Sequence, residues 1–363
     1  MPTKYSQSTP TYVIFLFMFK YLKSIVGIGT TLIALFVVST QALAQENLLN
    51  LYSSRHYETD EALYTNFTKL TGIKINRIEG GEDPLIERIR NEGDKSPADV
   101  LITVDAGRLW RAEQLGLFQP VKSRLLESRL PASYRHADGL WFGFSARARI
   151  IAYSRERVKP GDIASYEDLA NPKWKGRICT RSAGHVYNLS LISSLVNYLG
   201  EAKTEDWARA VTANLAHTPQ GGDTDQLKSV AAGECDLALS NTYYYARLLK
   251  SHKPDEKAVA EKVGVLFPNQ GDRGAHVNIS GAGVLKHAPN REAAVRFLEY
   301  LASDDAQNYF ANGNNEWSVV QSVKPNNAAL AALGKFKADN LNLGTIGRNQ
   351  PTAQKIADRS GFK

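Results

Sequence analysis

The sequence predicts an α/β protein of two doubly wound lobes that are joined by a two-strand hinge. Three observations predict this fold. The chain has 363 residues, which is long for a single core and indicates two domains of roughly 150 residues. From residue 48 onward, short apolar runs alternate with segments of helical periodicity. Two β-rich stretches, residues 140–153 and 275–285, are long enough to pass from one lobe to the other.

The first series of elements extends from residue 48 to residue 115. Apolar runs of strand length alternate there with stretches whose apolar residues recur every three or four positions. Repeated strand–helix units predict a mostly parallel sheet with helices on both faces. The expected strands are residues 48–53, 74–78 and 99–104, and the expected helices are residues 60–70, 84–91 and 106–115.

A second series follows the first β-rich stretch. The chain is expected to leave lobe 1 near Ser145 and to return near Ala275. Two such crossings form a hinge, and the cleft between hinged lobes is a common site for a small ligand. The expected elements are strands at residues 177–181, 236–240 and 263–267, with helices within 188–215, near 225–232 and from about 243. Lobe 1 then comprises residues 45–145 and 275–320, and lobe 2 comprises residues 146–274 and 321–363.

The composition excludes several other classes. Hydrophobic residues make up 43% of the chain and charged residues 22%, which argues against a disordered protein. Three of the 44 basic residues and none of the 37 acidic residues fall in the first 44 positions, so the remainder carries a net charge of only +4. Dense tracts of Lys and Arg interleaved with aromatics are absent, so no nucleic-acid partner is expected.

The first 44 residues are interpreted as an export signal. Lys20 and Lys23 form a charged start, residues 24–40 are largely apolar, and Ala42-Leu43-Ala44 is a small-x-small cleavage site. The mature protein is therefore expected to be exported after cleavage near Ala44. A retained membrane anchor is the alternative, and translation from Met18 would give a cleaner signal than translation from Met1.

The chain contains two cysteines, Cys179 and Cys235. An even number in an exported protein is compatible with one disulfide, because the compartment is oxidising. Cys179 lies in one expected strand and Cys235 lies just before another, so the two sulfur atoms can meet if those strands are neighbours. Two reduced core cysteines are the alternative.

Motif-borne catalytic chemistry is not evident in the sequence. It has no GxxxxGK[ST], GxGxxG, HExxH, CxxC or GxSxG pattern, and its seven histidines fit no zinc-ligand spacing. Glu79, Glu82 and Asp83 could supply the carboxylates of a secreted hydrolase. A cluster of this kind is more often a solvated turn and helix start. We therefore expect a protein that is not an enzyme.

Tyrosines mark three strand-to-helix junctions, at residues 53–57, 182–187 and 241–245. Each alone is more often explained by packing, since tyrosine is amphipathic. Together they are informative, because one lies in lobe 1 and two lie in lobe 2, where they would face each other across the cleft. His56 and His185 stand beside two of them at the carboxyl ends of strands, where ligand sites of α/β sheets lie.

Several phenolates in one site require a hard, highly charged cation. Ionising one phenol at neutral pH costs about 4 kcal/mol, so four would cost about 16 kcal/mol. Among biological cations Fe3+ fits best, because Mg2+ and Ca2+ prefer carboxylate and water whereas Zn2+ and Cu2+ recruit imidazole or thiolate. Neighbouring helical side chains diverge by ~100°, so Tyr243 and Tyr244 can share a metal only near a helix start, with Tyr245 left to pack.

Four phenolates around Fe3+ leave a charge of −1, which a guanidinium can balance. Arg147, on the first crossover strand, and Arg247, one helical turn after Tyr243, are the candidates. Spacing alone leaves open that both are surface residues.

Four segments make the sequence resemble the periplasmic ferric-ion-binding proteins of ABC transporters, most closely the Fut-type subgroup. They are residues 51–57 (LYSSRHY), 91–100 (NEGDKSPADV), 172–176 (PKWKG) and 241–245 (NTYYY). The resemblance covers essentially the whole mature chain. It implies a class II periplasmic-binding-protein fold whose lobes close on the metal in the cleft, a periplasmic location, and delivery of ferric iron to inner-membrane permease subunits.

The resemblance also implies roles for individual residues. Tyr57, Tyr187, Tyr243 and Tyr244 match phenolate ligands, His56 matches an occasional further ligand, and Arg147 and Arg247 match positions behind the ligands. Some relatives use a Glu after the third strand together with an exogenous anion. This chain has Val104 and Asp105 there, which favours an all-tyrosine site without such an anion.

The resulting hypothesis is a monomeric binding protein that captures Fe3+ and carries it as a transported ligand. The alternative with the same fold is a receptor for a small organic solute, such as a polyamine or a sugar, whose tyrosines stack on the ligand.

Overall fold

The structure is a computed structural model that describes residues 47–363 except residues 56, 58 and 160. The expected export signal and His56 therefore lie outside the described residues. Among the described helices, none combines the length and the apolar character needed to cross a membrane.

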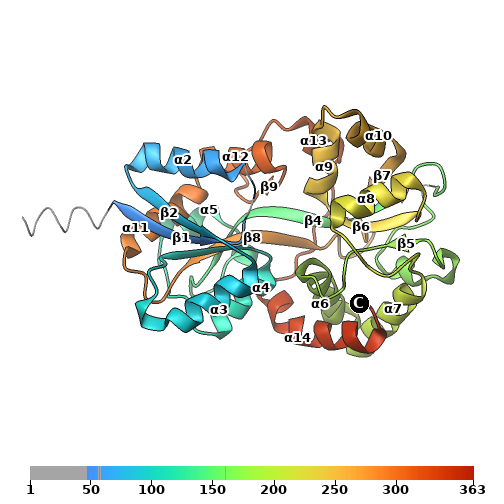
Figure 1. Cartoon of the computed structure of the whole chain (residues 1–363), viewed down its shortest axis with the longest axis horizontal. Coiled ribbons are helices and arrows are strands. Elements are labelled where there is room, and N and C mark those ends of the chain that lie inside the picture. Colours follow the sequence, from blue (N-terminus) through green and yellow to red (C-terminus); the bar gives the residue numbers. More distant parts are fainter. Residues whose placement is uncertain (1–46, 56, 58, 160) are drawn as a thin grey trace, which may run out of the picture. The chain divides into compact units, whose positions relative to one another are not determined.

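The strands form one sheet (Figure 1), in the order β2-β1-β3-β8-β4-β6-β5, with β7 and β9 paired to β4. The sheet thus runs without interruption through the two long strands that the sequence marked as crossovers. The strands are β1 (Leu48–Ser53), β2 (Lys74–Glu79), β3 (Val100–Val104), β4 (Phe142–Ser154), β5 (Ile178–Cys179), β6 (Leu237–Asn241), β7 (Val263–Leu266), β8 (Val277–Val284) and β9 (Trp317–Ser318).

The direction of the strands differs from the expectation of a mostly parallel sheet. The pairs β1–β3 and β5–β6 are parallel. By contrast, β8 is antiparallel to β3 and β4, and β4 is antiparallel to β6, β7 and β9. The expectation is wrong for the centre of the sheet, because the chain crosses along β4 and returns along β8, and two crossings in opposite directions pair antiparallel.

Helices cover both faces of the sheet, and the segment after β8 is mainly helical (Figure 1). The expected helices between residues 60 and 250 correspond to α2 to α4 and α6 to α9. The helices are α2 (Asp60–Thr71), α3 (Glu82–Glu92), α4 (Ala106–Gln114), α5 (Arg124–Arg129), α6 (Val186–Leu199), α7 (Glu201–Ala213), α8 (Asp223–Ala232), α9 (Thr242–Lys250), α10 (Pro254–Lys262), α11 (Arg291–Leu301), α12 (Asp304–Asn314), α13 (Ala328–Ala332) and α14 (Leu343–Ser360).

Buried apolar side chains fall into separate clusters that follow the sequence. One large cluster takes its residues from 49–148 and 275–323, and another takes them from 151–239 and 353–362. Strand β4 contributes to both, since Phe142 and Phe144 belong to the first and Ile151 to the second. Burial of apolar surface therefore stabilises two cores, each at roughly 25 cal/mol per Å².

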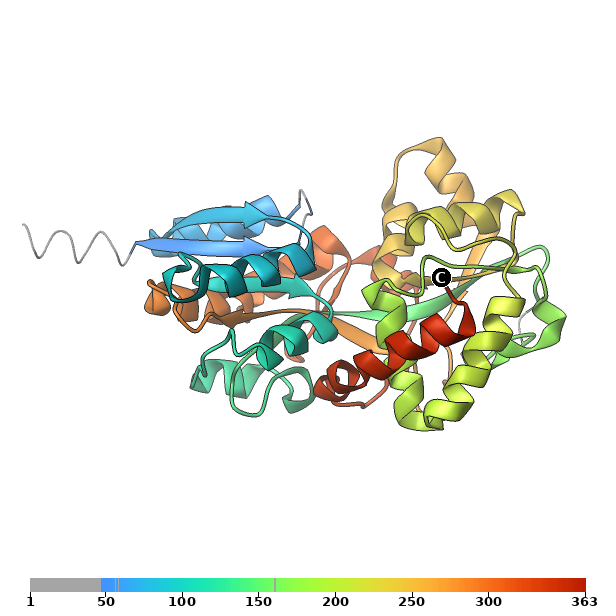
Figure 2. The ribbon, with the colours of Figure 1, turned by 60° about the horizontal axis from the view of Figure 1, so that its bottom comes forward.

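Helix α14 packs against helices of both series of elements. It packs along α6 and α7 and also reaches α4 (Figure 2). Its first turns bury Leu343 and Ile346 among residues of the β1–β3 side, whereas Ile356 is buried beside α6 and α7.

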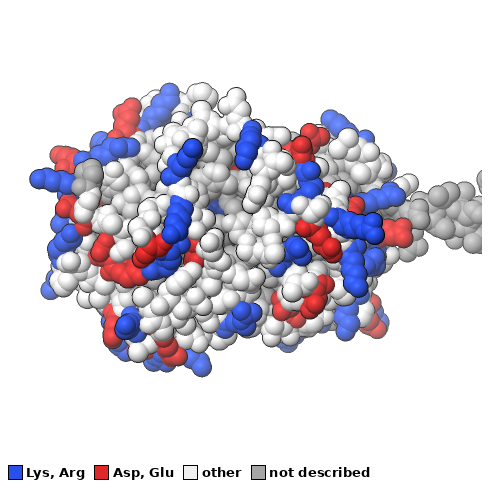
Figure 3. Space-filling model, turned by 180° about the vertical axis from the view of Figure 1, so that it is seen from behind, with Lys and Arg blue, Asp and Glu red and all other residues white. Residues whose placement is uncertain are grey.

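Charged side chains of both signs are interspersed over the face drawn in Figure 3. This distribution agrees with the small net charge of the chain after its first 44 residues.

Candidate metal centre

Each of the three tyrosine junctions lies where a strand gives way to a helix. Tyr57 lies between β1 and α2. Tyr187 is the second residue of α6, whose N-cap is His185, and the His185 ring accepts a hydrogen bond from the Tyr187 backbone N–H at 3.2 Å. Tyr243 and Tyr244 are in the first turn of α9. The carboxyl ends of the strands thus present all four side chains.

The structure brings these four tyrosines together. The hydroxyl oxygens of Tyr187 and Tyr243 lie 3.1 Å apart, within hydrogen-bond distance. The ring of Tyr57 meets that of Tyr243 edge to face, with 6.2 Å between centroids. The rings of Tyr243 and Tyr244 are 4.2 Å apart. Side chains separated by up to 187 positions in the sequence therefore form one phenol cluster, which we define as Tyr57, Tyr187, Tyr243 and Tyr244.

The surroundings of Tyr57, Tyr187 and Tyr243 keep their hydroxyls protonated. Tyr243 is fully buried and Tyr187 is 7% exposed. Burial, followed by the neighbouring tyrosines, raises the pKa of Tyr187 and Tyr243 well above its ordinary value. Burial and then Glu316 raise the pKa of Tyr57, against the opposing effect of Arg55. A cation that binds these oxygens as phenolates must therefore displace their protons.

Two arginines that the sequence singled out lie against the cluster. The guanidinium carbon of Arg247 is 5.0 Å from the ring centroid of Tyr57, 5.2 Å from that of Tyr243 and 5.7 Å from that of Tyr244. Arg147 is 5.7 Å from the ring of Tyr187 and donates to Ser280 Oγ at 2.9 Å. Positive charge is thus already in place behind the phenols.

Arg147 is buried and stays charged. Burial lowers its pKa, but the Glu316 carboxylate and then Tyr187, Tyr243 and Tyr57 raise it more. Glu316 Oε1 lies 3.7 Å from the guanidinium, and Glu316 also accepts a hydrogen bond from Ser145 at 2.9 Å.

Further charged residues lie beside the phenol cluster that the sequence analysis did not identify. Arg149 and Arg181 lie 5.9 and 5.1 Å from the ring of Tyr187, and both donate to the buried carboxylate of Asp223. Arg149 stands two positions after Arg147 on β4, and this spacing could have indicated that both side chains lie on the same face of the strand. The sequence did not indicate the contact with Asp223, because Asp223 lies 74 residues from Arg149.

Other side chains that could bind a metal make hydrogen bonds or ion pairs with other groups of the protein. His185 is the N-cap of α6, and burial followed by Arg181 lowers its pKa to about 3, so its ring is neutral. Asp83 pairs with Arg108 and Arg111 at the start of α3, outside the phenol cluster. Among the described residues, no group of three His, Cys, Asp or Glu side chains is arranged to hold a metal.

The two residues at the end of the third strand, Val104 and Asp105, make contacts within the protein. Val104 belongs to a small buried apolar cluster with Val186 and Tyr187, against which Tyr244 packs. The carboxylate of Asp105 points into hydrogen bonds with Gly107, Ser190 and Asn278.

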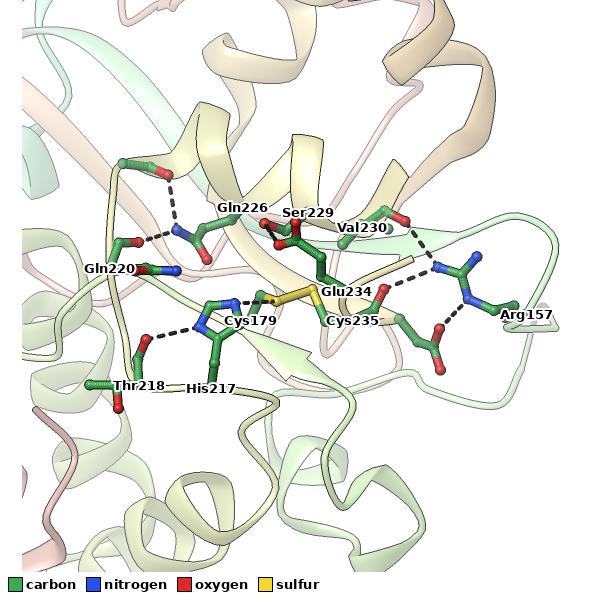
Figure 4. Close-up of a disulfide and its surroundings, with 12 residues drawn as sticks. Arg157, Cys179, His217, Thr218, Gln220, Gln226, Ser229, Val230, Glu234 and Cys235 are labelled. Carbon is green, nitrogen blue, oxygen red and sulfur yellow. Dashed lines mark hydrogen bonds and ion pairs between the residues drawn. A yellow bond between two sulfur atoms is a disulfide. The ribbon is translucent and has the colours of Figure 1, made fainter. Parts of the chain in front are cut away.

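Cys179 and Cys235 form a disulfide, with 5.8 Å between the Cα atoms (Figure 4). Both sulfurs are buried, and the Nε2 atom of His217 lies 3.4 Å from Cys179 Sγ. Each cysteine stands eight residues before a tyrosine of the phenol cluster, Tyr187 or Tyr243. The bond therefore joins β5 to the segment just before β6, and these two strands lead to those tyrosines.

Comparison with known proteins places the chain in a family. The family model for the bacterial extracellular solute-binding protein matches residues 95–337, which is more than half of the chain. The chain belongs to this family.

Relatives within the solute-binding family extend over nearly the whole chain. Iron uptake protein A2 of Synechocystis is 52% identical over 339 residues, which cover 92% of this chain and 96% of the relative. The major ferric iron-binding protein of Neisseria meningitidis serogroup B is 28% identical over 335 residues, covering 92% and 97%. The solved structure of Trichodesmium FutA (IdiA) in complex with iron and citrate ligands superposes with a TM-score of 0.83 at 53% identity, covering 87% of this chain and all of the other.

These similarities confirm the resemblance to Fut-type ferric-ion-binding proteins and the two-lobed periplasmic-binding-protein fold. The family consists of solute-binding proteins, in agreement with the expectation of a protein that is not an enzyme.

Proposed function

We propose that this protein captures ferric iron in the periplasm through the phenolates of Tyr57, Tyr187, Tyr243 and Tyr244 and delivers it to an ABC permease. The observation that carries the proposal is the phenol cluster itself, with the Tyr187 and Tyr243 oxygens 3.1 Å apart and the other two rings against Tyr243. The iron-uptake relatives support it independently.

The chemistry of the cluster selects the cation. Each phenol with an ordinary pKa costs about 4 kcal/mol to ionise at neutral pH, and the raised pKa values of Tyr57, Tyr187 and Tyr243 increase that cost. A trivalent cation offsets it, because its charge favours anionic oxygen donors. Arg147 and Arg247 are placed to balance the charge of −1 that four phenolates leave around Fe3+.

The proposed two lobes explain how the iron is enclosed. We assign residues 45–145 and 275–320 to lobe 1 and residues 146–274 and 321–363 to lobe 2. This division is supported by the two large apolar clusters, since all of the first except Ala146, Ala148 and Val323 falls in lobe 1 and all of the second falls in lobe 2. Lobe 1 then supplies Tyr57 and lobe 2 supplies the other three ligands. Closure about β4 and β8 completes the site, and opening by the permease releases the iron.

The proposal has further elements that the family resemblance supports only in part. We propose that the export signal is cleaved near Ala44 and that the mature protein works in the periplasm as a monomer. His56 is proposed as a further ligand beside Tyr57. The cluster of four phenols is proposed to hold iron without an exogenous anion.

The experiment compares two neighbouring tyrosines. Purified protein loaded with Fe3+ should be coloured by phenolate-to-iron charge transfer, with one iron per chain. Tyr243→Phe should weaken or abolish the band. Tyr245→Phe is the matched control, because the Tyr245 hydroxyl donates to the backbone carbonyl of Val263 at 2.9 Å and lies outside the cluster. Colourless protein without iron would reject the proposal, and a thermal shift with a polyamine or sugar instead would indicate an organic solute.

A further inference from the structure

Asp105 combines an unusual backbone with complete burial. It follows β3 and is the N-cap of α4, with φ of 91° and ψ of 128°. Its exposed fraction is 0%. Among the described non-glycine residues, only Asn269 and Asn315 share a positive φ, and theirs are smaller. A residue with a side chain held in such a conformation costs on the order of 1–3 kcal/mol, so the surrounding contacts must maintain it.

Three donors converge on the Asp105 carboxylate. The backbone N–H of Gly107 donates at 2.8 Å, the side-chain amide of Asn278 at 2.8 Å and the hydroxyl of Ser190 at 2.6 Å. The Asp105 backbone N–H donates to Ile279 O at 2.8 Å. The carboxylate accepts all three of these hydrogen bonds. Burial raises the pKa of Asp105, and the hydrogen bond from Ser190, followed by the charge of Arg147, opposes that rise by favouring the ionised form.

The donors come from three parts of the fold. Gly107 is in α4, Asn278 is in the crossover strand β8 and Ser190 is in α6. Gln350, in α14, donates to Ser190 Oγ at 3.3 Å. The same Gln350 side chain packs so closely on Gly107 that an added Cβ there would lie 1.7 Å from its Nε2. The Asp105–Ser190 bond is thus the centre of a tightly packed junction.

Helix capping alone does not account for this arrangement. A cap needs only the bond to the Gly107 N–H, and N-cap residues ordinarily have an extended backbone with negative φ. The strained conformation instead lets one carboxylate reach α6 and β8 as well as α4.

Ser190 is one helical turn after Tyr187, so the two side chains lie on the same side of α6. Val104, which precedes Asp105, belongs to the same small buried apolar cluster as Tyr187. The junction therefore fixes the segment after β3 to the part of α6 that carries a proposed ligand, and in the proposed division this contact joins lobe 1 to lobe 2.

We propose that Asp105 is a positioning residue that fastens α6, and with it Tyr187, to the β3–α4 junction and so favours the closed, iron-holding arrangement. This inference rests on the proposed function. It assigns to Asp105 a role in closure in place of metal coordination.

The first test compares two serines of α6. Ser190→Ala removes the donor to Asp105, whereas Ser193→Ala makes the same change at an equally buried position whose Oγ has no hydrogen-bond partner among the described residues. Iron affinity is measured for both by competition with citrate at one pH. Ser190→Ala should weaken iron binding about tenfold or more, because a hydrogen bond to a charged group is lost. Ser193→Ala should stay within about twofold of the unaltered protein.

Two further readouts separate positioning from general destabilisation. Iron-loaded Ser190→Ala should keep the charge-transfer band, because all four phenols remain. Its small-angle scattering with iron should show a larger open fraction than Ser193→Ala does. Equal iron affinities for the two variants would overturn the inference. Absence of a band in the unaltered protein would instead reject the proposed function.

A double-mutant cycle addresses Asp105 directly. Asp105→Asn keeps the shape of the side chain and removes its charge. If the two residues act through one bond, the double variant with Ser190→Ala binds iron no more weakly than the weaker single variant, whereas multiplicative losses contradict the coupling. If Asp105→Asn does not fold, the comparison of the two serine variants decides.

Discussion

Iron binding should become steeply weaker as the pH falls. Burial, aided by neighbouring groups, raises the pKa of Tyr57, Tyr187 and Tyr243 above its ordinary value of about 10, so these three phenols are protonated near neutral pH before the metal arrives. Each must release its proton to bind as a phenolate. Lower pH favours the protonated, iron-free form, and the affinity therefore falls with decreasing pH throughout the range below these pKa values.

The magnitude follows from the number of protons. One released proton changes the binding constant about tenfold per pH unit, or about 1.4 kcal/mol. Four phenols bind as phenolates in the proposed site, so four protons are released and the binding constant changes about ten-thousandfold per pH unit, or about 5.5 kcal/mol. Tyr243→Phe removes one titrating ligand and should lower the slope of log K against pH by about one.

The assay is competition with citrate between about pH 6 and 8, corrected for the protonation of citrate and the hydrolysis of iron. Tyr245→Phe provides the control and should keep the slope of the unaltered protein. A slope below one, or a slope that Tyr243→Phe leaves unchanged, would show that the phenols do not bind as anions.

Three further predictions concern the charge of Arg247, the Cys179–Cys235 disulfide and the buried His276. Arg247→Gln should weaken iron binding by about tenfold or more in citrate competition, since a guanidinium near three of the ligand rings is lost; unchanged affinity would contradict the charge argument. Reduction of the Cys179–Cys235 bond should lower the free energy of unfolding in urea by at most about 4 kcal/mol, from the entropy of a loop that spans 56 residues, and the double Cys→Ser variant should not respond to reductant. His276 is 2% exposed, and burial followed by Arg149 lowers its pKa to about 3. Its stabilising contribution is present above about pH 6.5 and is lost as the pH falls toward about 3. Unfolding of iron-free His276→Leu should therefore depend less on pH, by about 1.4 kcal/mol per unit between about pH 6 and 4, and parallel curves would contradict this.

The local pattern of the sequence was sufficient for much of the fold. Strand β1 and helix α2 follow from alternation of apolar runs and helical spacing, and their structural bounds agree closely with the expected ranges. Strand β5 is shorter than expected, with two residues instead of residues 177–181. The reason is tertiary, because the side chain of Asn188 on α6 donates to Thr180 Oγ1, Arg181 O and Ser182 O and holds that segment outside the sheet.

The candidate site was accessible to sequence reasoning because its residues stand at strand ends. Tyr57, Tyr187 and Tyr243 each follow a strand, and the carboxyl ends of strands meet at one edge of a sheet. The supporting charges were not accessible. Glu316 lies 171 residues after Ser145, to which it is hydrogen-bonded, and nothing in either local sequence indicates that contact.

Asp105 is a further residue whose contacts could not be predicted from the local sequence. The sequence placed it after the third strand and excluded a glutamate ligand there. Its positive φ and its bond to Ser190, 85 residues away, depend on the packing of α4, α6 and β8 around it.

The decisive experiment is a crystal structure of the iron-loaded protein, with the metal located by its anomalous scattering. We expect one iron atom in contact with the hydroxyl oxygens of Tyr57, Tyr187, Tyr243 and Tyr244, with Arg147 and Arg247 behind them. Iron bound at another place, or a closed structure in which these four oxygens do not reach a common atom, would contradict it.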